Sequence, residues 1–242
     1  MTTGLPLPIP QEAPEKRTFP WATWGPWEAI GATVMALIIG ILLSFPVYIL
    51  SGSFDPDELG LSTKVAAQLC AGAAFILVPF GLAYLSGGGS LRVVYRRLGF
   101  HSFDVRNAFK WVAIGIFSYF AFAAIYGAIF GTPEQDDIAG DFGPIGLQIL
   151  LIVIVAPVTE EVCFRGMLFG GIRTRLPLWA AALAAGAVFG ALHYTTGPSA
   201  VVPLIALGAV FSVVYEKTGS IWVTILMHAF NNGLALLFLN LT

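Results

Sequence analysis

The chain has 242 residues, of which 57% are hydrophobic and only 11% are charged. A soluble domain usually carries about 25% charged residues, and so much apolar surface left in water would cause aggregation. The composition therefore argues for a membrane protein. Twelve Lys and Arg against 14 Asp and Glu give a net charge of -2, which argues against nucleic acid as a partner. The only two cysteines, Cys70 and Cys163, lie in apolar runs, which argues against a secreted disulfide scaffold.

Apolar runs follow a polar N-terminal tail. The first 26 residues contain prolines and charges but no apolar central region, so we expect a poorly ordered tail over 1–26 rather than a secretory signal. Over 27–242, uncharged runs recur whose lengths approach the roughly 20 residues that a helix needs to cross a bilayer. We expect a single all-α domain, a polytopic membrane helical bundle of about seven transmembrane helices at Trp27–Leu50, Val65–Ser86, Trp111–Gly131, Gly146–Gly170, Leu178–His193, Val201–Tyr215 and Ser220–Leu241. The fifth and sixth runs are short, which leaves tilted, extended or incomplete spans open.

The loop charges predict how these helices are oriented. If the spans alternate, the loop Lys and Arg gather on the side of the N-terminus, and the opposite side is acidic apart from Lys64. The positive-inside rule then places the N-terminus in the cytoplasm of a multi-pass plasma-membrane protein, which fits a bacterial chain. The basic group is Lys16, Arg17, Arg92, Arg96, Arg97, Arg106, Lys110, Arg173, Arg175 and Lys217, and the acidic group is Asp55, Asp57, Glu58, Glu134, Asp136, Asp137 and Asp141. The tryptophans fall at the same predicted cytoplasmic ends, as residues of an interfacial belt do: Trp21, Trp24, Trp27, Trp111, Trp179 and Trp222.

Two further patterns concern lipid contact and packing. The segment Gly87–Lys110 is too polar to span, and its mixture of apolar and basic residues predicts a short interfacial helix on anionic lipid. Membrane lipids are therefore expected partners. In the fifth run, Ala182, Gly186 and Gly190 recur every four residues, a spacing that favours close approach of another helix.

Two adjacent carboxylates, Glu160 and Glu161, interrupt the fourth run. Ionisable residues inside spans are costly and are functional candidates by default. Glu161 and Arg165 are four residues apart, in the order that favours an ion pair, and a purely structural pair remains an open alternative. Glu160 points about 100° away without an obvious partner, which makes it the candidate general acid or base. Pro157 cannot donate to the carbonyl of Val153, so a kink there is expected to open backbone groups towards a cavity.

Three polar groups in later runs accompany Glu160. His193 ends the fifth run, and His228 and Asn232 share one face of the seventh. If these groups face one cavity, they would activate water and hold an oxyanion, although a lone buried histidine is more often a hydrogen-bonded core residue. His193 and His228 would also suit a divalent metal such as zinc, but no His-Glu-x-x-His helix proves one. Helical rise places Glu160 and His228 in the cytoplasmic half of the membrane and His193 nearer the outer face. The three side chains therefore meet only if the fifth helix starts deeper in the membrane than Leu178 suggests, or if the helices tilt strongly.

The motifs, in chain order, are Glu160-Glu161-x-x-x-Arg165, Phe189-x-x-x-His193 and His228-x-x-x-Asn232. On separate spans and in this order, they resemble the pattern of the intramembrane CAAX protease and bacteriocin-processing family, also called the Abi family. Each motif is weak alone, whereas three in order are fairly specific. The resemblance covers about residues 146–242, and the first three runs match the family only in hydropathy.

The resemblance implies a peptidase site open to the cytoplasm that acts on a peptide or protein. It implies that Glu160 activates the attacking water and that Glu161 pairs with Arg165. It also implies that three further residues line the site, namely His193, His228 and Asn232. In the family, residues at these positions bind the water or the oxyanion, and in some accounts a metal. Eukaryotic relatives cut after a prenylated cysteine, a substrate that is not expected in a bacterium, so the substrate stays open. Two other functions also stay open: an ion-coupled transporter that uses Glu160 in a proton relay, and a non-catalytic immunity or scaffold protein.

Overall fold

The computed structural model describes residues 19–87, 89–133, 142–194 and 197–241. These ranges consist of helices and connecting turns, without a strand. Within them, the helices long and apolar enough to cross a membrane are Pro26–Ser51 (α1), Leu61–Leu85 (α2), Val105–Phe130 (α4), the compound span Ile145–Arg173, Pro198–Thr218 and Ile221–Leu239 (α10). A shorter apolar helix, Leu178–Leu192 (α8), lies where the fifth run was predicted. The predicted polytopic helical bundle is therefore confirmed.

Short elements join the spans, and local hydrogen bonds fix where helices begin. The connections contain Pro56–Glu58 (η1), Leu91–Arg97 (α3) and Pro198–Ala200 (η6), the last leading into Val201–Thr218 (α9). The third span begins ahead of the predicted Trp111, because Asp104 caps it. The Asp104 carboxylate accepts from the backbone N–H of Arg106 at 2.7 Å and of Asn107 at 3.2 Å. The predicted interfacial segment is thus divided between α3 and the first turns of α4.

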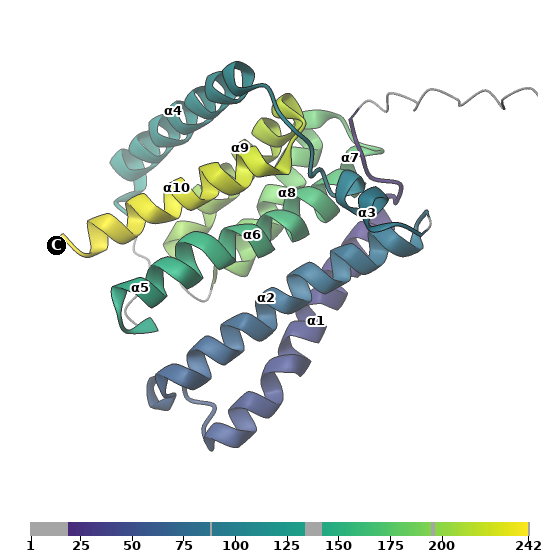
Figure 1. The fold of residues 1–242 in the computed structure, drawn as a ribbon. Coiled ribbons are helices and arrows are strands. Elements are labelled where there is room, and N and C mark those ends of the chain that lie inside the picture. The colour runs from purple at the N-terminus through teal and green to yellow at the C-terminus, as the bar shows by residue number, and fades with distance from the viewer. Residues whose placement is uncertain (1–18, 88, 134–141, 195–196, 242) are drawn as a thin grey trace, which may run out of the picture.

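The compound fourth span lies at the centre of the bundle (Figure 1). It contacts the α1–α2 hairpin on one side and α8, α9 and α10 on the other. Half of its central stretch is buried, against 6% of α4, which lies at the edge of the bundle and packs mainly on α9. Ionisable side chains on the fourth span are therefore held inside protein, whereas α4 is left largely to lipid.

Helices α8 and α9 approach each other closely through glycines. A Cβ added to Gly186 would lie 2.5 Å from the Ile205 carbonyl oxygen, and one added to Gly190 would lie 2.7 Å from the Val201 carbonyl oxygen. A Cβ added to Gly208 on α9 would likewise lie 3.0 Å from the Cα of Gly186. The predicted close approach at the small residues of the fifth run is confirmed.

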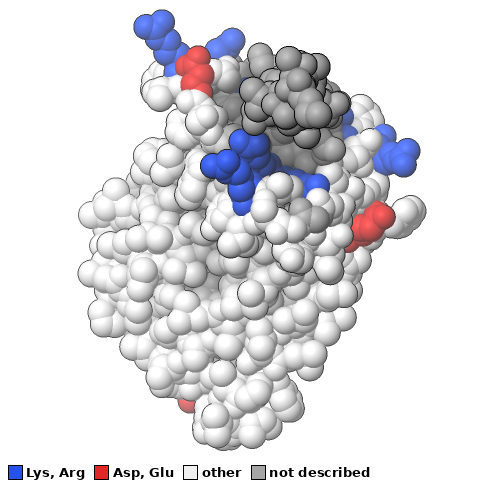
Figure 2. Space-filling model, turned by 45° about the vertical axis from the view of Figure 1, so that its right-hand side comes forward, with Lys and Arg blue, Asp and Glu red and all other residues white. Residues whose placement is uncertain are grey.

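Basic side chains gather at one end of the molecule, where Figure 2 shows them above a broad uncharged surface. The alternating path of the helices brings three connecting segments together at that end: 89–104, which contains α3, 174–177 and 219–220. We call it the basic end. The predicted loop charges Lys16, Arg17, Glu134, Asp136, Asp137 and Asp141 lie outside the described residues. The segregation agrees with the predicted alternation of spans, and the cytoplasmic assignment of this end stays a prediction.

The N-terminal segment 19–25 packs into the basic end. Trp24 is 3% exposed, and its indole N–H donates to the Met167 carbonyl at 2.9 Å. The prediction that Trp24 belongs to an interfacial belt is therefore wrong, because its ring lies inside the protein. Trp27, by contrast, is 82% exposed. The centroid of the His101 ring lies 4.4 Å from that of the Trp21 ring, with the two planes tilted by 44°, and burial lowers the pKa of this imidazole.

The glycine contact between α8 and α9 leads to a stability prediction. Gly186→Ala forces a methyl group against the α9 backbone, and we expect it to destabilise the fold by about 1–3 kcal/mol. Thermal unfolding of the purified protein in detergent measures the effect. Gly127→Ala on α4 is the matched control, since a Cβ there meets nothing within 4 Å. An equal change in midpoint for the two variants would contradict the packing described here.

Candidate active site

The backbone of the fourth span alternates between two helical forms. Ile145–Gln148 (α5) leads into a π-helical segment, Ile149–Val155 (η3), followed by Ala156–Glu161 (α6), a second π-helical segment, Val162–Phe169 (η4), and Gly170–Arg173 (α7). π-Helical turns are rare and often occur at functional sites. The two candidate glutamates lie on the short α-helical piece between two such segments.

Pro157 and Asn232 explain how the first π-helical segment ends. The N–H of Ala156 donates to the carbonyl of Leu151, five residues back. The next bond in this register would run from residue 157 to the carbonyl of Ile152, but Pro157 has no N–H. The side-chain amide of Asn232 donates to that Ile152 carbonyl instead, at 3.0 Å. Pro157 thus leaves the carbonyl of Ile152, rather than that of the expected Val153, without a backbone donor, because the register is wider. The predicted opening towards a cavity stays a prediction.

Glu161 and Arg165 form the predicted ion pair in full burial. Arg165 Nη1 lies 2.9 Å from Glu161 Oε1, and the two side chains are 1% and 0% exposed. The guanidinium lies 4.6 Å from the ring centroid of Phe189 and 4.9 Å from that of Phe211, at distances of cation–π contacts. Its Nη2 also approaches the Gly208 carbonyl at 3.4 Å.

This pair is incompletely hydrogen-bonded. Glu161 Oε2, Arg165 Nε and Arg165 Nη1 are buried and have no hydrogen-bond partner among the described residues, so the 2.9 Å contact of Nη1 with Glu161 is an ion pair rather than a hydrogen bond. Taking two charges out of water costs several kcal/mol per ion, and a buried pair adds net stability only when its geometry and remaining hydrogen bonds are good. The arrangement is therefore poorly explained by stability alone, which favours a functional role for the pair.

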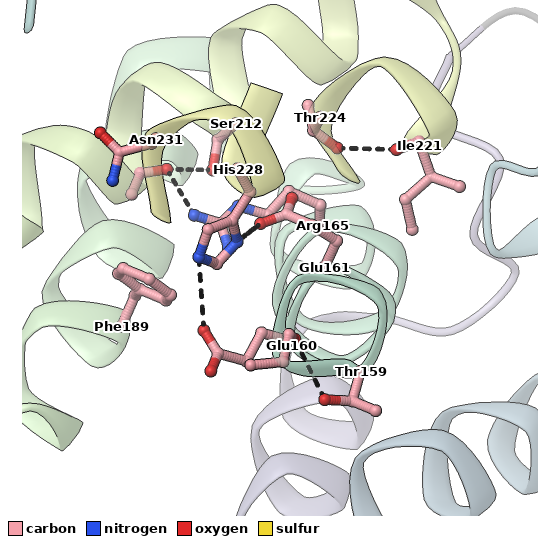
Figure 3. A network of polar contacts seen from close by, with 12 residues as sticks. Thr159, Glu160, Glu161, Arg165, Phe189, Ser212, Ile221, Thr224, His228 and Asn231 are labelled. Carbon is pink, nitrogen blue, oxygen red and sulfur yellow. Dashed lines mark hydrogen bonds and ion pairs between the residues drawn. The ribbon is translucent and has the colours of Figure 1, made fainter. Parts of the chain in front are cut away.

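His228 lies between the two glutamates, as Figure 3 shows. Its Nδ1 is 2.9 Å from Glu161 Oε1, and its Nε2 is 3.8 Å from Glu160 Oε2. The ring also packs at 4.9 Å on the ring of Phe211. A carboxylate paired with an arginine only accepts hydrogen bonds, so His228 Nδ1 donates to Glu161, and in the neutral ring Nε2 is then an acceptor.

Glu160 forms the open edge of this cluster. Its side chain is 19% exposed, whereas the side chains of His228, Glu161 and Arg165 are at most 4% exposed. The 3.8 Å separation from His228 Nε2 exceeds a direct hydrogen bond, so the two groups face each other without bonding directly. The cluster therefore places a carboxylate and an imidazole nitrogen side by side where solvent can reach the carboxylate.

His193 and His228 both have their rings against the ring of Phe189. His193 caps the C-terminus of α8, and its Nδ1 is 2.8 Å from the Phe189 carbonyl. The Phe189 ring lies 4.8 Å from the His193 ring and 5.9 Å from the His228 ring. The 15 residues of α8 span about 22 Å, less than the roughly 30 Å of a hydrocarbon core, so His193 need not reach the opposite surface.

The described residues do not fit a three-ligand zinc site. Among them, no three His, Cys, Asp or Glu side chains come together as candidate metal ligands. Glu161 Oε1 already lies 2.9 Å from both Arg165 Nη1 and His228 Nδ1, which leaves Glu160 and His228 as the near pair. A catalytic zinc in proteins usually has three protein ligands.

One functional contact was missed at the sequence level. Helical spacing predicts Glu161 with Arg165, but nothing in the sequence predicts that Glu161 also holds His228, 67 residues away. Asn232 was expected to bind the water or oxyanion, whereas its amide holds a backbone carbonyl.

Fold and site together define a polytopic helical membrane protein with a buried carboxylate–imidazole cluster. Comparison with known proteins agrees with this description. Residues 143–234 match a family model described as "Type II CAAX prenyl endopeptidase Rce1-like". This range contains all six predicted site residues: Glu160, Glu161, Arg165, His193, His228 and Asn232.

A second comparison finds a relative in Bacillus subtilis (strain 168). That protein is named "Putative membrane peptidase YdiL" and is 28% identical over 130 residues, which cover 50% of this chain and 52% of the relative. The match thus spans about half the length of that protein. No solved structure matches the chain. The two matches confirm the resemblance to the CAAX protease and bacteriocin-processing family of intramembrane proteases.

The backbone role of Asn232 leads to a double-mutant prediction. Asn232→Ala leaves the Ile152 carbonyl without its donor, at an expected cost of about 1–3 kcal/mol. Pro157→Ala restores an N–H at residue 157, so in that background the cost of Asn232→Ala should fall to well below half. Thermal unfolding of the wild type, both single variants and the double variant measures the coupling. Additive effects would contradict the proposed exchange of donors.

Proposed function

We propose that this chain is a membrane-embedded endopeptidase that hydrolyses a peptide bond near its basic, cytoplasmic end with a glutamate-activated water. The observation that carries the proposal is the position of His228, 2.9 Å from Glu161 and 3.8 Å from Glu160. The matches to a CAAX endopeptidase family and to a protein named as a membrane peptidase support it. In the proposed role, Glu160 and His228 contact the reacting water.

The water lies between the two acceptors. It donates one proton to Glu160 Oε2 and the other to His228 Nε2, which leaves its oxygen lone pairs free to attack. This requires the imidazole proton to stay on Nδ1, and Glu161 holds it there. Arg165 supplies the opposite charge to Glu161 in an environment that excludes water. Glu161 and Arg165 are therefore positioning residues for His228.

The reaction then proceeds as general acid–base catalysis. Glu160 takes a proton from the water as its oxygen bonds to the carbonyl carbon of the substrate. The protonated Glu160 passes that proton to the amide nitrogen as the carbon–nitrogen bond breaks. The carboxylate is regenerated, and one water is consumed for each peptide bond. His193 stays a predicted member of the site, and Asn232 shapes the helix that carries Glu160.

The proposed substrate is a peptide or protein segment that reaches the basic end of the bundle. The proposed location is the plasma membrane of a bacterium, with the basic loops in the cytoplasm. The mechanism needs no metal, because Glu160 and His228 alone hold the water.

The first test is substitution of Glu160. The purified protein is incubated in detergent with a solubilised membrane proteome, and new peptide N-termini are identified by mass spectrometry. Wild type should generate a defined set of cleavages, and Glu160→Gln should reduce their rate by about 100-fold or more, since it removes the general base.

The control is Glu58→Gln, an exposed glutamate at the opposite end that bonds to Ser53. It should cleave at the wild-type rate. Cleavage by Glu160→Gln at the wild-type rate would rule out the mechanism. Loss of cleavage on treatment with a chelator, restored by zinc, would show that the water is activated by a metal instead.

A further inference from the structure

One side chain outside the cluster, that of Trp24, holds the backbone of the fourth span close to Arg165. Its indole N–H donates to the carbonyl of Met167 at 2.9 Å, from a position 143 residues away in the sequence. Met167 belongs to the second π-helical segment, η4, which begins directly after Glu161 and contains Arg165. The N-terminal segment 19–25 thus contacts the element that carries the cationic half of the ion pair.

The hydrogen bonds at the end of η4 connect this contact to Arg165. The N–H of Gly170 is shared between two carbonyls, that of Arg165 five residues back and that of Met167 three residues back. The bond to Arg165 keeps the π-helical register, whereas the bond to Met167 is of the tighter 3₁₀ type. Because the Met167 carbonyl also accepts from Trp24, it competes less for the Gly170 N–H, which favours the bond to Arg165.

The first π-helical segment, η3, has a corresponding contact. There the side-chain amide of Asn232 donates to the carbonyl of Ile152 at 3.0 Å, from a position 80 residues away. In each of the two segments, therefore, a distant side chain donates to one backbone carbonyl. Such donors stabilise a local departure from the α-helical ladder, in which each interior carbonyl is satisfied by its own helix. The two carbonyls flank Glu160 and Glu161 along the span.

The packing around Trp24 leaves space for its ring and little else. The residue is 3% exposed, whereas Trp27 is 82% exposed. A Cβ added to Gly171 would lie 2.7 Å from Trp24 Cδ1, so a glycine at this position admits the ring. The preceding residue is also anchored, because Thr23 Oγ1 lies 3.0 Å from Ser86 Oγ at the end of α2. The indole is therefore held against η4 from both sides.

We propose that Trp24 is a positioning residue for the reaction proposed above. Its hydrogen bond keeps η4 in the π-helical register that points Arg165 at Glu161. If η4 relaxed towards α-helical bonding, the residues after Glu161 would turn about the helix axis, and Arg165 would move relative to the carboxylate. His228 would lose its fixed orientation as well, since Glu161 Oε1 contacts both partners. The inference rests on the proposed function, so its first test uses no substrate.

Nitrogen-15 NMR of the histidine-labelled protein in detergent is that first test. Trp24→Phe keeps an aromatic ring and removes the N–H donor, and Trp27→Phe is the matched control at an exposed tryptophan. We expect the His228 ring signals to shift in Trp24→Phe and to stay at the wild-type positions in Trp27→Phe. Unchanged His228 signals in Trp24→Phe, or equal shifts in the two variants, would overturn the proposal whether or not the chain cleaves peptides.

Steady-state kinetics form the second test, with a peptide taken from a wild-type cleavage site. Trp24→Phe should lower kcat by about 10-fold, the size expected for one lost buried hydrogen bond. KM should stay close to the wild-type value, because Trp24 does not contact the substrate. A raised KM at the wild-type kcat would overturn the proposal. A wild type that cleaves nothing would refute the proposed function instead, and the NMR result would still decide the role of Trp24.

A disulfide between residues 23 and 86 separates positioning from simple anchoring. Thr23→Cys with Ser86→Cys fastens the N-terminal segment when the pair is oxidised and releases it when the pair is reduced. Added to Trp24→Phe, the oxidised pair should leave kcat low, and full recovery would overturn the proposal by showing that Trp24 only anchors the segment. With Trp24 intact, oxidised and reduced forms should cleave equally. Loss of cleavage on oxidation would overturn the proposal by showing that the segment must open as a lid.

Discussion

The carboxylate of Glu161 is fully out of water, and the rest of the site depends on what surrounds it. An isolated buried charge is so costly that the group would neutralise or the structure would rearrange. Arg165 supplies the opposite charge from the same helix, and His228 supplies a hydrogen bond from another span. Three phenylalanine rings surround the guanidinium and exclude solvent, namely Phe164, Phe189 and Phe211. Because one oxygen of Glu161 contacts both partners at 2.9 Å, the orientation of His228 and the position of Arg165 are coupled.

That coupling requires the fourth span to present two adjacent glutamates in different directions. The π-helical segments on either side of α6 widen the turns locally, and Pro157 ends the first of them because it has no N–H to continue the register. Asn232, which lies on α10 one turn beyond His228, then donates its side-chain amide to the Ile152 carbonyl that lacks a backbone donor. Helix α10 thus contributes to the site twice, once through an imidazole and once through an amide that holds the neighbouring helix.

Much of this arrangement follows from local rules. Hydropathy alone predicts the spans, because helices that cross a bilayer need long uncharged runs. Spacing by four predicts the pair of Glu161 with Arg165 and the close approach at Gly186, since both depend on a single helical face. The contact of Glu161 with His228 is not predictable in this way, because it depends on how separate spans pack. The burial of Trp24 is not predictable either, because a tryptophan at this position suits a lipid interface equally well. The same holds for the shift in hydrogen-bond register at Ile152.

The central claim is that Glu161 fixes the proton of His228 on Nδ1, so that Nε2 faces Glu160 as an acceptor. Nitrogen-15 NMR of the histidine-labelled protein at neutral pH tests it most directly, with the His228 signals assigned by their absence from His228→Gln. We expect a protonated Nδ1 and an unprotonated Nε2 in the wild type, and loss of this preference in Glu161→Gln. A proton on Nε2 in the wild type, or an unchanged tautomer in Glu161→Gln, would contradict the account.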